Sequence, residues 1–291
     1  MKKFVKIMLI IAAVFTVLGI CFCVAGASMG ATMEGVEVVR QFKARFGDRF
    51  SDYFYAEYDD DKWEDDWKEY LDPQKDDGKG SRSYTRPTAK KLELNLRYDD
   101  VYFKAGSGNE ILVEVANDPE NNVRIHSETD EIEIRSIKHK NNRKITVSVP
   151  DKTRFDELEI DLDAGAITID QDLFAANLGI SVGAGEMNAN SVLSAKEAEI
   201  EVGAGSVAIF KLDAQSVKGE CGLGEMNITL KGKKEDYNCH VECGVGSLNV
   251  GQEDFSGFSG EHSLNHNGAT RTLELECGMG ELNADFDGEK L

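Results

Sequence analysis

The chain has 291 residues, of which 41% are hydrophobic, so it can bury one large core or two modest ones. With 33 basic and 53 acidic side chains its formal charge is −20, which argues against a nucleic-acid partner because polyanions repel each other. Such acidity indicates a well-solvated surface, or a surface that gathers divalent cations.

Residues 1–31 are predicted to form a membrane anchor. Three lysines precede an uncharged, mostly apolar run from Ile7 to Ala31, and about 20 such residues suffice to cross a bilayer. The alternative is a cleaved signal peptide, since Ala25-Gly26-Ala27 has the small-residue spacing of a cleavage site. The positive-inside rule places the N-terminus in the cytoplasm and the rest outside. We therefore expect a single-pass protein of the cell membrane with an extracytoplasmic C-terminal domain.

Residues 32–71 are predicted to form an amphipathic helical segment with an aromatic stripe. Phe42, Phe46 and Phe50 recur at a spacing of four, and "KWEDDWKEYL" continues the stripe. The stripe either packs on the neighbouring domain or on itself, or it mediates self-association or contact with a membrane surface. Residues 72–89, which include "DPQKDDGKGSRS", are predicted to form a polar linker.

From Lys90 onward the hydrophobic period changes to two. Apolar and polar residues alternate in "KLELNLRY", "DVYFKAG", "EILVEVAN", "EIEIRSI", "KITVSVP" and "ELEIDLD". Gly, Asn, Asp and Pro separate these stretches, which is typical of strands joined by turns.

A glycine-centred motif then recurs from Glu159 to the end of the chain. Its six copies are "EIDLDAGAITI", "GISVGAGEMNA", "EVGAGSVAIF", "KGECGLGEMNI", "HVECGVGSLNV" and "ELECGMGELNA". A period of about 20 residues predicts an all-β fold, a β-solenoid over residues 90–291, in which the longer last interval hides one degenerate coil. A dinucleotide loop is disfavoured, because its third glycine would fall at Ala208.

The glycines of this motif are predicted to turn corners. Val202 and Val207 lie five residues apart, which on one straight strand would put them on opposite faces. Both can point inward only if the chain bends between them, and glycine tolerates the unusual backbone angles of such a bend. The predicted structural corners are Gly165, Gly183, Gly185, Gly203, Gly205, Gly222, Gly224, Gly244, Gly246, Gly278 and Gly280.

Stacking of coils about 4.8 Å apart aligns equivalent residues in columns. Cys221, Cys243 and Cys277 occupy valine positions of an inward column. Together with Cys239 they are either free core thiols or members of a disulfide, and no Cys-x-x-Cys pair supports a zinc or redox site. We expect no cofactor. The best candidate for cation binding is the outward column Glu201, Glu220, Glu242 and Glu276.

Two further outward columns carry polar side chains. One contains Ala166, Glu186, Ser206, Glu225, Ser247 and Glu281, in which alternation of Glu with Ser limits repulsion. Carboxylates spaced by two coils, about 9–10 Å, also suggest the acid and base of an inverting glycosidase. The other column, Asn188, Asn227, Asn249 and Asn283, is predicted to form an amide ladder.

The basic start, the single apolar run and the iterated "GAGEMN", "GLGEMN", "GVGSLN" and "GMGELN" motifs resemble the bacterial putative-adhesin family of β-strand-repeat proteins. The resemblance covers about Lys90 to Phe286. It implies a cell-envelope β-solenoid of unknown function, sometimes associated with envelope stress, and supplies no catalytic residues. The expected function is a binding or scaffold module, not an enzyme, whose partner is an envelope protein or a cell-wall component; the alternative is a carbohydrate-active enzyme on the same solenoid.

Overall fold

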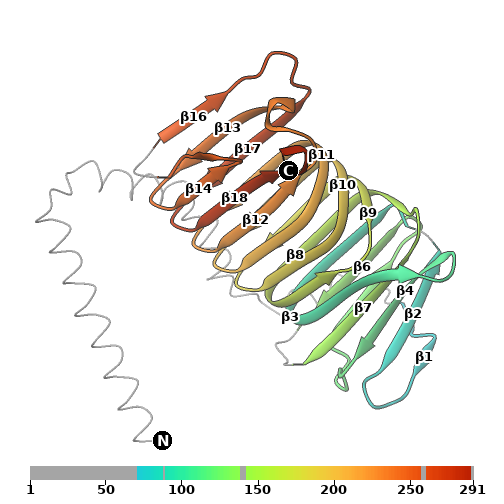
Figure 1. The fold of residues 1–291 in the computed structure, drawn as a ribbon. Coiled ribbons are helices and arrows are strands. Elements are labelled where there is room, and N and C mark those ends of the chain that lie inside the picture. Colours follow the sequence, from blue (N-terminus) through green and yellow to red (C-terminus); the bar gives the residue numbers. More distant parts are fainter. Residues whose placement is uncertain (1–70, 88, 138–141, 257–259, 290–291) are drawn as a thin grey trace, which may run out of the picture. The chain divides into compact units, whose positions relative to one another are not determined.

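The computed structural model describes residues 71–87, 89–137, 142–256 and 260–289. The predicted membrane anchor and aromatic helical segment therefore lie outside the described residues, apart from Leu71. In the described part of the chain, no helix has the length and apolar character needed to cross a membrane. Strands make up most of the described residues, as the period-two pattern predicts, and the domain extends from β1 at one end to β16 at the other (Figure 1).

The first strands form the N-terminal end of the domain. They are β1 (Lys75–Asp76), β2 (Arg82–Pro87), β3 (Lys91–Gly106), β4 (Glu110–Ala116), β5 (Val123–Ser127), β6 (Glu131–Ser136) and β7 (Arg143–Pro150). The sequence predicts a linker over residues 72–89, but β2 pairs there with β4 in antiparallel register. The linker prediction is corrected because Tyr84 is buried in the core and Arg82 forms a buried ion pair of 2.5 Å with Asp118.

The solenoid coils follow. Their strands are β8 (Arg154–Ile169), β9 (Leu173–Val182), β10 (Glu186–Val202), β11 (Ser206–Cys221), β12 (Glu225–Leu230), β13 (Tyr237–Cys243), β14 (Ser247–Val250), β15 (Glu253–Asp254), β16 (Gly260–Leu264), β17 (Arg271–Cys277) and β18 (Glu281–Phe286). Two 3₁₀ turns, η1 (Lys234–Asp236) and η2 (Asp287–Glu289), complete the described elements.

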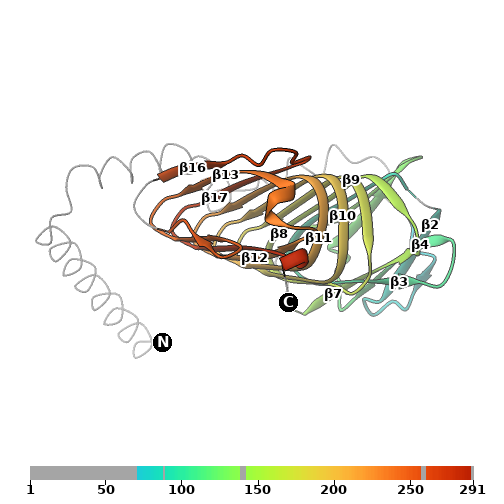
Figure 2. The same ribbon diagram turned by 45° about the horizontal axis from the view of Figure 1, so that its top comes forward.

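The strands pair in two sets, because each G-x-G corner turns the chain from one set to the other. The long strands β3, β8, β10 and β11 contribute one part to each set and therefore occur in both orders below. We call the set before the corner sheet A; its order is β5, β6, β3, β8, β9, β10, β11, β17, β13, β16. The set after the corner is sheet B; its order is β1, β2, β4, β7, β3, β8, β10, β11, β12, β18, β14, β15. Figure 2 shows strands of the two sets as separate layers.

The core lies between the two sheets. Alternate residues of each strand are buried, such as Ile200 and Val202 from sheet A and Val207 and Ile209 from sheet B. Both pairs flanking the corner therefore point inward, as the change of parity predicts.

The last coil does not extend the stack. Strand β17 pairs with β11 on one side and β13 on the other, and β18 likewise lies between β12 and β14. The sequence predicts a hidden degenerate coil before Glu274, but Glu253–Asp254 and Gly260–Leu264 instead form the antiparallel edge strands β15 and β16. The connection returns the chain so that the final coil inserts between two earlier ones.

Candidate functional site

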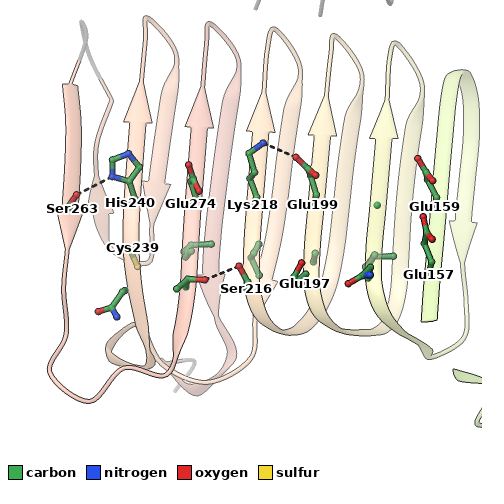
Figure 3. A pocket seen from close by; sticks show the side chains of 18 of the residues that line it. Glu157, Glu159, Glu197, Glu199, Ser216, Lys218, Cys239, His240, Ser263 and Glu274 are labelled. Carbon is green, nitrogen blue, oxygen red and sulfur yellow. Dashed lines mark hydrogen bonds and ion pairs between the residues drawn. The ribbon is translucent and has the colours of Figure 1, made fainter. Parts of the chain in front are cut away.

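The outer face of sheet A carries a groove of about 640 Å³ that crosses the coils. Its charged lining includes Glu157, Glu159, Glu199, Lys218 and Glu274. Figure 3 shows these side chains lying side by side on neighbouring strands, with His240 and Ser263 at one end. The outward residues lie in rows across the coils because the strands are parallel and in register.

The predicted cation column lies two residues closer to the corner, along each strand, than the row that contains Glu199, Lys218 and Glu274. The structure brings its four glutamates together, but in a different order: Glu201 pairs in register with Glu220, Glu220 with Glu276, and Glu276 with Glu242. The inserted coil therefore places Glu276, and not Glu242, beside Glu220. In antiparallel register, Glu261 of β16 extends the column beyond Glu242.

The ammonium group of Lys218 lies among the carboxylates that come closest together at this column. Carboxylate oxygens of Glu199, Glu201 and Glu220 lie within 4.8 Å of one another. The Nζ atom of Lys218 lies 2.8 Å from Glu199 and 2.6 Å from Glu220. Burial opposes the charge of Lys218, but the hydrogen bonds to these two carboxylates outweigh it and raise the pKa of the lysine. The ammonium group thus provides the positive charge that a bound cation would provide.

Asp161 belongs to the same column, because it pairs in register with Ser181, and Ser181 with Glu201. Burial, together with the charges of Glu159, Glu93 and Glu201, raises the pKa of Asp161 to about 7. Burial and the charge of Glu93 also raise the pKa of Glu159. Burial is the largest cause of the shift at Asp161, and the neighbouring glutamates add to it because like charges lie close together at this end of the column.

The predicted corner glycines stack directly on one another. A Cβ at Gly205 would lie 2.2 Å from the carbonyl oxygen of Gly185, and one at Gly224 would lie 2.2 Å from that of Gly205. Gly280 continues the series on Gly224, and Gly246 on Gly280, each at 2.3 Å. This series has the same coil order as the strand register.

The reason for glycine at Gly205 differs from the expected one. Its φ lies outside the left-handed range, so unusual backbone angles do not require glycine there. The close approach of the neighbouring carbonyl requires it, because any Cβ would overlap that oxygen. Of the predicted corners, Gly165 has a left-handed φ of +111°, and its Cβ would also lie 2.4 Å from the carbonyl oxygen of Asp99.

The four described cysteines are buried and form no disulfide with one another. Cys277 pairs in register with both Cys221 and Cys243, so the three thiols form one inward row in the order 221, 277, 243. They fill positions equivalent to Val182 and Val202, which agrees with the interpretation as core residues.

These features define a two-sheet β-solenoid with an acidic groove on the outer face of sheet A. The chain belongs to the family described as Toastrack DUF4097, which matches residues 89–289 and has no established function. Among curated proteins, none matches this chain.

Three solved structures are similar to this chain at low identity. A "putative cell adhesion protein" from Clostridium sporogenes is 15% identical, with 71% of this chain and 100% of that chain covered and a TM-score of 0.36. A "putative adhesin" from Bacteroides fragilis is 14% identical, with 71% and 95% covered and a TM-score of 0.38. A "putative lipid binding protein" from Parabacteroides distasonis is 11% identical, with 70% and 95% covered and a TM-score of 0.33.

Proposed function

We propose that this protein is a membrane-anchored, extracytoplasmic β-solenoid that serves as an adhesin-like binding or scaffold module in the bacterial cell envelope, with a role in the response to envelope stress. The observation that carries the binding function is the acidic groove on sheet A. Its carboxylates Glu157, Glu159, Glu197, Glu199 and Glu274 lie on β8, β10 and β17, so an extended partner with several positive charges meets carboxylates on three strands of the groove.

The anchoring is supported by the order of lysines and apolar residues in residues 1–31. Protease added to intact protoplasts is expected to digest the solenoid, whereas a cytoplasmic control protein survives. Full protection of the solenoid would overturn the extracytoplasmic placement. Deletion of the gene is expected to increase sensitivity to wall-active agents, and an unchanged sensitivity would remove the envelope-stress role.

The groove is tested with a short polylysine peptide as the cationic probe. The double change Glu199→Gln with Glu274→Gln is expected to weaken binding several-fold and to flatten its salt dependence. The charge-matched control is Glu186→Gln with Glu281→Gln on sheet B, which removes the same charge from the other sheet. Equal weakening by both pairs would show a response to net charge alone and would contradict the groove as the binding surface.

A further inference from the structure

The outer face of sheet B carries a hydrogen-bonded amide ladder. Asn249 donates from Nδ2 to Oδ1 of Asn283 at 2.8 Å, and Asn283 donates to Oδ1 of Asn227 at 2.9 Å. Asn227 and Asn283 also donate to the carboxylates of Glu225 and Glu281, each two residues earlier in its own strand. The ladder therefore runs in one direction across the inserted coil, and it donates hydrogen bonds to two carboxylates of the neighbouring glutamate column.

The ladder is interrupted at one coil. Asn227 pairs in register with Ala208, whose methyl group accepts no hydrogen bond, and Ala208 pairs in turn with Asn188. Asn188 makes the same bond to Glu186, at 2.7 Å, as the ladder members make to their own glutamates. From this common orientation we infer that an amide donor of Asn227 and the amide oxygen of Asn188 face each other across Ala208. Two strand spacings, roughly 9–10 Å, separate these two residues.

The interruption coincides with a hollow of about 210 Å³. Its lining includes Asn188, Ala208, Phe210, Asn227 and Thr229. Phe210 is 65% exposed, more than any other large hydrophobic residue in the described part of the chain. It lies where the strand register shifts between Ile209 and Leu212, so the chain bends there and the phenyl ring is left at the rim of the hollow.

We propose that this hollow on sheet B binds a neutral sugar ring, with Phe210 as the stacking surface and Asn188 and Asn227 as the hydrogen-bonding groups. Pyranose rings present C–H groups that pack on an aromatic ring and hydroxyl groups that both donate and accept. An amide donor facing an amide acceptor satisfies such hydroxyls from two sides. The volume lies below the ~300–1,000 Å³ of pockets for larger ligands, so the hollow accepts one ring.

The surrounding charge selects against acidic sugars. Glu186 and Glu225 lie in the neighbouring column, on the strands of Asn188 and Asn227. A uronic or sialic acid would bring a like charge close to both carboxylates. A second exposed aromatic residue, Tyr102, lies in the same column as Asn188, beyond Thr168. A neutral glycan that follows the coils would therefore meet Phe210 first and Tyr102 further along.

This site deepens the proposed binding function and rests on it, because it names a ligand class for the module. The test uses full-length protein in a detergent without a sugar headgroup, with chitotriose as the neutral probe and trigalacturonate as the acidic one. Titration followed by saturation-transfer NMR is expected to show binding of chitotriose only, with Kd in roughly the millimolar range. Phe210→Ala is expected to weaken that binding roughly threefold to tenfold.

The decisive variant is Ala208→Asn, which extends the amide ladder into the hollow. It is expected to keep or raise the melting temperature while abolishing sugar binding, a combination that misfolding cannot produce. Leu223→Ala, which trims an exposed apolar residue at a G-x-G corner, is the control and should bind as wild type. Asn188→Ala should also lose binding.

Absence of saturable chitotriose binding up to roughly 10 mM, or unchanged binding by Ala208→Asn and Phe210→Ala, would overturn the site. Preferred binding of trigalacturonate would overturn its selectivity. None of these results touches the proposed envelope function, because polylysine binding on sheet A and protease digestion of protoplasts measure that function separately.

Discussion

At the scale of single residues, stacking of the corners decides which positions tolerate a side chain. Gly205→Ala places a Cβ 2.2 Å from a backbone oxygen that hydrogen bonds hold in place. We expect a loss of about 1–3 kcal/mol in the free energy of unfolding, measured by urea denaturation. Gly179→Ala is the matched control, because its Cβ would make an ordinary contact of 3.6 Å with Glu159. An equal loss in both variants would contradict the stacking argument.

Asp161 makes the stability of the domain depend on pH. Its pKa is raised from 3.8 to about 7, so the folded chain holds a proton that the unfolded chain has released between these values. The free energy of unfolding therefore falls as pH rises from about 4 to about 7, and the loss persists above pH 7. Asp161→Asn is expected to be more stable than wild type by about 1–3 kcal/mol at pH 8.

The check on this prediction is a series of thermal melts from pH 4 to pH 8. The advantage of Asp161→Asn should shrink to a small remainder at pH 4, where the folded carboxyl is protonated and the unfolded one is close to its pKa of 3.8. The exposed residue Asp151 supplies the control Asp151→Asn, which removes the same charge from a turn between two strands. An advantage of Asp161→Asn that is constant across the series would show an effect other than titration.

At the scale of elements, the order of coils changes which charges meet. The sequence places Lys218 two residues before Glu220 on the same strand, but only the register brings it against Glu199 of the neighbouring strand.

We expect wild-type stability to respond equally to calcium and to sodium chloride at matched ionic strength. Lys218→Met should gain a rise in melting temperature in about 5 mM calcium, above the Kd of weak extracellular sites.

The expected gain follows from three carboxylates that lose their internal cation. Lys104→Met is the control, since Lys104 pairs with Glu114 away from this cluster. A calcium-specific rise in wild type would show that Lys218 does not fill the cluster, and no rise in Lys218→Met would show that its carboxylates repel without forming a site.

Most strands could be predicted from the sequence, because period-two alternation survives wherever one face of a strand is buried. Two predicted strands, "KLELNLRY" and "DVYFKAG", are one continuous strand, β3, in the structure. The apparent break falls at Asp99, which is fully buried and bonds to Arg143 at 2.6 Å. A partner 44 residues away is invisible in the local pattern. Strand β2 escapes prediction for the same reason, since its burial depends on pairing with β4.

The candidate sites were predictable only in part. The acidic and asparagine columns follow from the repeat, because equivalent positions of stacked coils must align. The order of residues within a column could not be predicted from the repeat. Every copy of the repeat has a similar strand edge, so the sequence does not say which two copies lie side by side. Thus the predicted alternation of Glu with Ser fails where Glu225 lies beside Glu281. The hollow at Ala208 depends on this alignment together with the bend at Phe210.

At the scale of the whole molecule, the inserted coil predicts an unusual response to truncation. In a solenoid built in sequence order, each added coil contributes an interface with its predecessor, so the longer of two truncated chains is the more stable. Here, ending the chain at Asn267 removes β17 and β18, which are the parallel partners of β13 and β14. Those two strands then keep only their antiparallel neighbours β16 and β15. Ending the chain at Leu230 instead removes the whole C-terminal group and leaves β11 and β12 paired with the preceding coil.

We therefore expect the shorter chain, ending at Leu230, to be recovered in soluble form and to melt in one cooperative transition. The longer chain, ending at Asn267, should aggregate or melt at a lower temperature, because unpaired strand edges of β11, β12, β13 and β14 are exposed together. Both truncations retain the same N-terminal residues, so the comparison is made in the same detergent with the full chain as reference. A longer chain that melts above the shorter one would mean that the coils stack in sequence order, and the neighbour relations of Glu220 with Glu276 and of Asn227 with Asn283 would fail with it.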